Sequence, residues 1–272
     1  MPEPTAEASI KATVYNLAQA WRRDLLENVV PFWLKHSLDH VHGGYFTALG
    51  REGELLDDSK YVWLQGRAVF MWSRLHNQLG KDVGAAVRDQ WFAAAQLGAD
   101  WTRQHGKDSD GRLYFAVSRD GSSPLHFQRK PYAATFHVLG CLEFADALRR
   151  RADSDVPTDG AADPQVYLDE AVAYFELLRS WVDDPSRLGR LPPSASPVSN
   201  ASGEPGPPAA LPSVLAEVMC LSSLSLELLD KLPERRDEWL EHVRDAQRRV
   251  KQHYDPKRRI LMEQVLEAPI EP

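Results

Sequence analysis

The chain has 272 residues, of which 43% are hydrophobic and 26% charged, and its formal net charge is -7 at pH 7. This composition is typical of a globular protein and excludes a largely disordered chain. The acidic balance argues against nucleic acid or an anionic membrane as partner, because both favour a basic surface. No stretch approaches the roughly 18 apolar residues of a membrane span, and the N-terminus lacks the pattern of a secretion signal, so we expect a cytoplasmic protein.

Helical periodicity dominates the rest of the chain. In the first segment, apolar residues recur at spacings of three and four, from Val14 to Val29, and predict one long amphipathic helix. The two cysteines, Cys141 and Cys220, lie in later apolar helical stretches and are expected to be buried free thiols. The expected helices cover residues 6–36, 60–79, 83–105, 131–150, a segment that begins at Asp163-Pro164, 209–231 and 233–254.

Two short segments 68 residues apart carry the same pattern. GGYFTALGREG begins at Gly43 and GRLYFAVSRDG begins at Gly111, so that Gly53 aligns with Gly121. Glycines at both ends of a short apolar run are typical of a tight hairpin. Strands are therefore expected only in these turns, between pairs of helices. Fainter echoes of the pattern occur at residues 184–189 and 255–260.

Helix pairs repeated about every 70 residues and joined by small hairpins predict an all-α fold, an α/α toroid in which inner helices line a pocket and outer helices shield them. We interpret residues 1–272 as one such domain, with three helix pairs and a seventh helix. Six pairs would close the ring, so we expect an incomplete (α/α)6 barrel. The proline-rich segment 191–212 breaks the rhythm and is interpreted as a flexible surface loop, with a gate over the pocket as the alternative.

The segment 42–67 is the strongest candidate for a pocket wall. Its hairpin leads into a helix that we expect Asp57 and Asp58 to cap. Aromatic rings suit the apolar C–H faces of a sugar, while glutamine and arginine donate to hydroxyl and carbonyl oxygens. Packing explains the aromatic residues equally well. The candidate substrate-binding residues are Tyr61, Trp63, Gln65 and Arg67.

The helical period separates these four candidates into two pairs. Tyr61 and Gln65 share one helix face, and Trp63 and Arg67 share another, because positions two residues apart diverge by about 200° on an ideal helix. We expect Trp63 and Arg67 to face the pocket.

The run FWLKHSLDHVHGGYFTALGREGELLDDSKYVWLQGRAVFMWSRL, from Phe32 to Leu75, resembles the N-acylglucosamine 2-epimerase family, also known as renin-binding protein. The motifs HGGYFT, LGREG and YVWLQGR occur together and in the right order, and the resemblance continues more weakly through SRDG at Ser118 and beyond. It implies an (α/α)6 barrel and an isomerase that interconverts N-acetylglucosamine and N-acetylmannosamine in sialic acid metabolism. It also implies a homodimer, with ATP or a related nucleotide as activator and no required cofactor or metal.

The implied chemistry is ring opening, removal of the C2 proton and reprotonation on the opposite face. This needs two acid/base groups and a positive donor for the enediolate oxygens. The resemblance assigns the donor to Arg67, whose planar fork keeps its charge at any working pH. In the family the acid/base groups are histidines late in the chain, at positions that this sequence does not contain. We therefore expect a shortened and inactive chain.

His137, on an expected inner helix, is the best remaining candidate for proton transfer, although a lone helical histidine is more often a core residue. His36, His40 and His42 resemble a metal-ligand spacing but have no cysteine or clustered carboxylate beside them, so no metal site is predicted. Two alternatives to the enzyme remain. In the first, the chain is a non-catalytic subunit that binds renin or dimerises with full-length protein. In the second, the open toroid does not fold stably.

Overall fold

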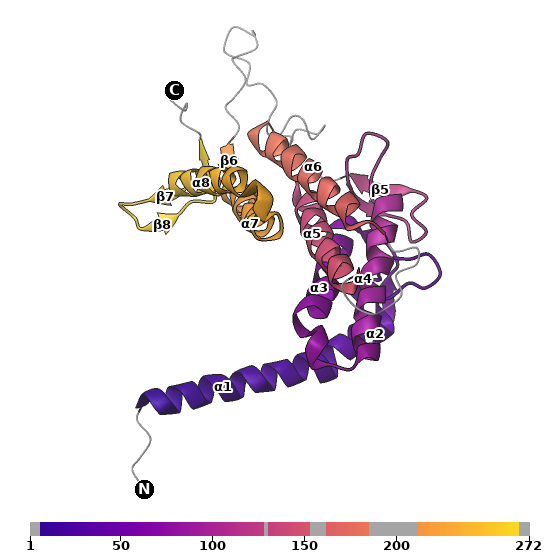
Figure 1. Cartoon of the computed structure of the whole chain (residues 1–272). Helices are drawn as coiled ribbons and strands as arrows, with labels where there is room; N and C mark the ends of the chain where they lie inside the picture. The colour runs from indigo at the N-terminus through magenta and orange to yellow at the C-terminus, as the bar shows by residue number, and fades with distance from the viewer. Residues whose placement is uncertain (1–5, 128–129, 153–161, 185–211, 267–272) are drawn as a thin grey trace.

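The computed structural model describes residues 6–127, 130–152, 162–184 and 212–266. Within them, helices form the body and the strands are short. They pair in hairpins or, for Lys60–Tyr61 and Pro212–Val214, with distant segments, which agrees with the all-α prediction (Figure 1). The described helices fall into an inner row and an outer row. The inner row is α3 (Val62–Leu79), α5 (Tyr132–Ala152) and α7 (Leu215–Lys231), and the outer row is α4 (Ala85–His105), α6 (Pro164–Asp183) and α8 (Arg236–Gln252).

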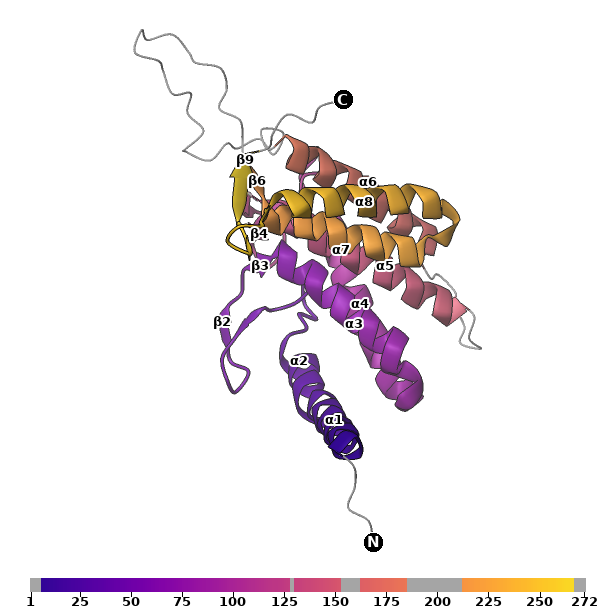
Figure 2. The same cartoon turned by 90° about the vertical axis from the view of Figure 1, so that its left-hand side faces the viewer.

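The two rows follow from which helices pack together. In the inner row, α5 lies between α3 and α7, and each inner helix also packs against the outer helix that follows it in the chain. Figure 2 shows one such pair, α7 and α8, side by side. This is the arrangement expected of helix pairs in a toroid, here as an arc of three pairs.

The inner helices α3 and α5 touch backbone to backbone. A Cβ on Gly66 would lie 2.8 Å from the carbonyl carbon and oxygen of Phe136, and a Cβ on Gly140 would lie 2.9 Å from the carbonyl oxygen of Gly66. Both positions therefore require glycine. This close contact brings the side chains on either side of the crossing within reach of one another.

The repeated hairpins are present at the predicted positions. Gly43 and Gly111 have φ of 80° and 78°, and Gly53 and Gly121 have φ of 91° and 75°, so the aligned glycines share the left-handed conformation that glycine adopts most readily. The strands are β1 (Ala48–Leu49) with β2 (Leu55–Asp57), β3 (Lys60–Tyr61) with β4 (Tyr114–Val117) and β5 (Pro124–Phe127), β6 (Pro212–Val214) with β9 (Gln264–Leu266), and β7 (Tyr254–Asp255) with β8 (Ile260–Leu261).

Several predicted boundaries hold and others need correction. Asp163 caps α6, and its carboxylate accepts from the backbone N–H of Gln165 at 2.9 Å. The cap predicted at Asp57 and Asp58 is wrong, because β3 intervenes and Tyr61 becomes the first flanking residue of α3. Asp57 instead accepts from the backbone N–H of Ser59 at 2.9 Å. The helix expected from residue 209 begins at Leu215, because Pro212–Val214 pairs with β9.

The predicted first helix is divided into α1 (Ala6–Asp24), a π-helical turn (Leu25–Val29) and α2 (Val30–His36). Its apolar stripe is largely uncovered, since Val14, Leu17 and Trp21 are 61%, 47% and 71% exposed. The physical reason is that α1 projects from the body and packs mainly against the adjoining π-helical turn, with an ion pair from Arg22 to Asp82 at 3.0 Å (Figure 1).

Two predictions concern residues outside the described ranges. These are the proline-rich loop, of which only Pro212 is described, and the echo at 184–189 after Asp184. The echo at 255–260 forms the β7–β8 hairpin. In the described part of the chain, none of the helices combines the length and apolarity that crossing a membrane requires.

Candidate functional site

The inner face of α3 and α5 carries a cluster of two rings and a guanidinium. The Trp63 and Phe136 ring centroids are 5.8 Å apart, and the guanidinium carbon of Arg67 lies 5.4 Å from the Phe136 centroid. Trp63 and Arg67 therefore share a face, as the helical period predicted. Their role in binding a substrate stays a prediction.

Arg67 has no charged partner within the described part of the chain. Its side chain is exposed, and its guanidinium lies over the face of Phe136. A guanidinium over an aromatic ring gains a modest cation–π attraction and keeps its N–H donors available. The site therefore presents a fixed positive donor beside two rings.

Two helical turns further along, the same face is closed by ion pairs. Arg74 of α3 lies 3.2 Å from Glu143 of α5 and 3.5 Å from Glu227 of α7. Lys231 of α7 approaches Glu143 at 3.4 Å. Since these charges compensate one another, they fasten the three inner helices together. We call this layer the floor, and the exposed Arg67 lies two helical turns nearer the start of α3.

We call the layer that contains Trp63, Arg67 and Phe136 the upper layer. The third inner helix contributes a carboxylate to it. Glu217, in the first turn of α7, is 8% exposed and accepts from Lys130 Nζ at 2.8 Å. Tyr132 lies next to them, one turn before Phe136 on the same face of α5. Burial, together with the negative charge of Glu217, raises the pKa of the Tyr132 phenol. The upper layer thus runs from Trp63 on α3 to Glu217 on α7.

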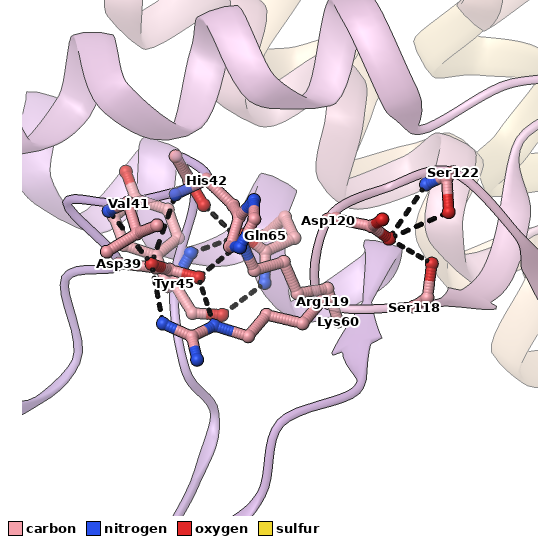
Figure 3. Close-up of polar contacts among 11 residues, drawn as sticks. Asp39, Val41, His42, Tyr45, Lys60, Gln65, Ser118, Arg119, Asp120 and Ser122 are labelled. Atoms are coloured by element: carbon pink, nitrogen blue, oxygen red, sulfur yellow. Dashed lines mark hydrogen bonds and ion pairs between the residues drawn. The ribbon is translucent and has the colours of Figure 1, made fainter.

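A buried charge network fixes the loops that lead into α3 (Figure 3). Asp39 is 1% exposed and lies 3.1 Å from Lys60 Nζ and 3.0 Å from Arg119 Nε, and Lys60 also donates to the carbonyl oxygen of Gly43. Burial opposes the charged carboxylate. Even so, hydrogen bonds from Arg119 and Lys60 hold the pKa of Asp39 well below its usual range. Because Lys60 lies two residues before the first residue of α3, this network helps to set where that helix begins.

The other two sugar-binding candidates, Tyr61 and Gln65, have structural partners. The Gln65 amide is fully buried and bonds both the backbone N–H and the carbonyl oxygen of Tyr45, each at 2.8 Å. The phenol of Tyr61 donates to Asp57 Oδ2 at 3.0 Å, and its ring meets Phe115 edge-on. Both side chains hold the hairpins against α3.

His137 points to the outer row. Its Nε2 lies 3.0 Å from Glu170 on α6, and its ring packs edge-on against Tyr174 at 4.9 Å. Burial opposes its charged form, but contacts with Cys141 and with the Glu170 carboxylate outweigh burial and raise the pKa of His137 to about 9. A protonated histidine buried against a carboxylate fits the core interpretation weighed from the sequence, not the catalytic one.

Potential metal ligands converge at one place in the described residues. Oxygen and nitrogen atoms of Glu176, Glu238 and His242 lie within 4.8 Å of one another on the outer helices α6 and α8. Both carboxylates already have arginine partners, since Arg179 bonds Glu176 at 2.9 Å and Arg235 bonds Glu238. This group is remote in sequence from His36, His40 and His42.

The sequence analysis missed the α5 and α7 parts of the upper layer. Tyr132 and Phe136 are spaced one turn apart on an expected inner helix, which is the signal that could have revealed them. Glu217 and Lys130 are 87 residues apart, and only the packing of α5 against α7 brings them together.

Comparisons with solved structures confirm the fold. A cellobiose 2-epimerase from Bacillus thermoamylovorans B4167 superposes with a TM-score of 0.67 at 15% identity, over 91% of this chain and 58% of that one. A sugar epimerase from a ruminal bacterium gives a TM-score of 0.65 at 18% identity, over 90% and 57%. By fold, the chain is thus part of an (α/α)6 barrel.

Comparison with known sequences identifies the family within this fold. Residues 44–162 match the N-acylglucosamine 2-epimerase (GlcNAc 2-epimerase) family. The N-acylglucosamine 2-epimerase of Homo sapiens is 32% identical over 257 residues, which is 92% of this chain and 52% of the human protein. The chain belongs to the N-acylglucosamine 2-epimerase family. It spans about half the length of the human relative.

Proposed function

We propose that this protein acts in the epimerisation of N-acylglucosamine at C2, interconverting N-acetylglucosamine and N-acetylmannosamine. The observation that carries the proposal is Arg67, an exposed guanidinium with no charged partner among the described residues, held beside Trp63 and Phe136. All three residues lie in the segment that matches the family. An amino sugar is the substrate that the family's name supports.

The upper layer suits this substrate chemically. Once the sugar ring opens, the C1 carbonyl acidifies the C2 proton, and removal of that proton leaves negative charge on an enediolate. Arg67 donates to both enediolate oxygens and stabilises the charge where it develops. The rings of Trp63 and Phe136 cover the C–H faces of the sugar and exclude water from one side.

Proton transfer at C2 needs two further groups, and the proposal gives this role to neither His137 nor Gln65. His137 is bonded to Glu170 on the outer helix, and Gln65 is bonded to the Tyr45 backbone. The charged groups on the described inner face, apart from Arg67, are engaged in ion pairs. This observation favours a second candidate function, a sugar-binding subunit without turnover that dimerises or binds renin.

Deuterium exchange tests the proposal directly. N-acetylmannosamine is incubated with the protein in deuterated water, and turnover is detected by NMR as N-acetylglucosamine labelled at C2. Arg67→Ala should lower this rate by about 100-fold, the cost of losing one oxyanion donor. Arg51→Ala, at an exposed hairpin position, serves as control.

Unchanged exchange in Arg67→Ala would contradict the role given to Arg67. Sugar binding without exchange at C2 would support the non-catalytic subunit. A non-catalytic subunit also requires a partner, and co-purification with a full-length epimerase or with renin would reveal it.

The proposal extends to the protein's setting. We place it in the cytoplasm and in sialic acid metabolism, as a homodimer that ATP or another nucleotide activates without a required cofactor. The family resemblance supports these points. Sedimentation with and without ATP measures the dimer, and the exchange rate with added nucleotide measures activation.

A further inference from the structure

The ion pair between Lys130 and Glu217 occupies an unusual place in the fold. The carboxylate is 8% exposed and the lysine is 50% exposed, and Nζ and Oε1 are 2.8 Å apart. One member precedes the second inner helix, and the other lies in the first turn of the third. The pair therefore lies at the amino ends of two neighbouring inner helices, where the charge of Glu217 also acts on Tyr132.

The two charged layers differ in how their ion pairs are arranged. In the floor the ion pairs form a network, because Arg74 approaches both Glu143 and Glu227 and Lys231 also approaches Glu143. In the upper layer, Glu217 has Lys130 as its one ion-pair partner within the described residues. A largely buried carboxylate with a single partner retains hydrogen-bond acceptor capacity.

The pair complements the hydroxyl groups of a sugar. A carboxylate accepts O–H donors, and an ammonium donates to hydroxyl oxygens with the protons that its ion pair leaves available. Two adjacent hydroxyls that bridge Nζ and a carboxylate oxygen would satisfy both groups. The neighbouring Tyr132 ring offers a surface against which the sugar carbons can pack.

We propose that Lys130 and Glu217 bind adjacent hydroxyl groups of the sugar, and that Glu217 selects neutral sugars over anionic ones. This inference rests on the proposed function, because it takes the ligand of Arg67 to be the same sugar. Arg67 holds the end of the open chain that reacts, and the Lys130–Glu217 pair holds hydroxyls further along it. A phosphate near Glu217 would meet a carboxylate in a poorly hydrated place and be repelled.

The test is a binding measurement by calorimetry or NMR, which needs no turnover. N-acetylmannosamine and the same sugar phosphorylated at O6 are titrated into the wild type, Glu217→Gln and Lys130→Met. We expect the wild type to prefer the neutral sugar. Glu217→Gln should weaken binding of the neutral sugar about tenfold, as for loss of one charge-assisted hydrogen bond, and should reduce the preference against the phosphorylated sugar.

Two further variants separate this role from a structural one. Glu227→Gln removes a carboxylate from the same helix, in the floor, and should leave both affinities unchanged. Lys130→Arg keeps the charge and should retain most of the binding that Lys130→Met loses. Because Lys130 is half exposed, its variants should fold even if Glu217→Gln does not.

The outcomes are distinct. The inference is overturned if Glu217→Gln and Lys130→Met bind both sugars as the wild type does, or if Glu227→Gln loses as much affinity as Glu217→Gln. A wild type that binds neither sugar, with a cooperative unfolding transition to prove that it is folded, overturns the proposed function along with this inference. If wild-type binding requires Arg67 but not Glu217, the proposed function is supported and this inference is wrong.

Discussion

At the scale of single residues, burial and charge pairing separate structural from functional side chains. Sequence periodicity predicted that Trp63 and Arg67 share a helix face, and the structure places both beside Phe136. It did not predict the structural role of Gln65. Spacing alone does not show that both the oxygen and the nitrogen of its side-chain amide form hydrogen bonds with the backbone of the distant Tyr45. Contacts between residues far apart in the chain decide such cases.

The His137–Glu170 pair predicts a pH dependence of stability. The pKa of His137 is raised to about 9 by contacts that outweigh burial, and the pKa of Glu170 is lowered to about 2, because bonds from His137 and Lys107 outweigh burial. A raised histidine pKa stabilises the fold fully below about pH 6.5, and this contribution is lost as pH rises through 9. A lowered carboxylate pKa stabilises above about pH 4.5, and its contribution is lost as pH falls towards 2.

We therefore expect the free energy of unfolding, measured with urea, to fall by about 1–2 kcal/mol between pH 6.5 and 9.5 through this pair. His137→Gln should be less stable than the wild type at pH 6.5 and should show a smaller decline over that range. An equal decline in both proteins would mean that His137 does not titrate as the contacts imply.

At the scale of elements, helix pairs and hairpins were predictable because their signals are local. Aligned glycines predicted both hairpins, and Asp163-Pro164 predicted the start of α6. The start of α3 was not predictable, because the local sequence is compatible both with a cap at Asp57 and with a short strand that ends at Tyr61. Strand β3 exists because β4, more than 50 residues later, pairs with it.

The contact between α3 and α5 predicts a strong effect of one methyl group. Gly66→Ala would place Cβ 2.8 Å from the Phe136 backbone, so the helices must separate, at a cost of about 2–3 kcal/mol in the free energy of unfolding. Gly84→Ala is the matched control, because nothing lies within 4 Å of its Cβ and its φ is -64°. Thermal and urea unfolding of both variants measure the difference, and equal stabilities would show that the crossing is looser than described.

At the scale of the whole molecule, the described residues form an arc with one helix projecting from it (Figure 1). The repeat of about 70 residues was sufficient to predict the toroid, because each repeat corresponds to one helix pair and its hairpin. The exposure of α1 was not predictable, because an amphipathic pattern says only that a face suits burial. Here Ile10, Val14 and Trp21 remain exposed.

Removal of this helix is expected to leave the body intact. Since α1 packs mainly against the adjoining π-helical turn and its Arg22–Asp82 ion pair lies outside the deleted segment, deletion of residues 1–20 should change Tm by less than about 2 °C. Differential scanning calorimetry of the deletion variant and the full chain makes the comparison. A large drop in Tm would show that the exposed face of α1 is covered in solution.

The three inner helices also share a direction. Successive contacts advance together along α3 and α5, from Arg67–Phe136 to Arg74–Glu143, and the contact of Lys231 with Glu143 extends the same order to α7. Their amino ends therefore meet at the end of the arc where Arg67 and Glu217 lie, and neither α3 nor α7 has a side-chain cap. Each such end carries about half a positive charge. The peptide backbone thus adds a favourable electric field for the negative charge proposed to develop on the enediolate beside Arg67, and this field would survive the loss of any one side chain.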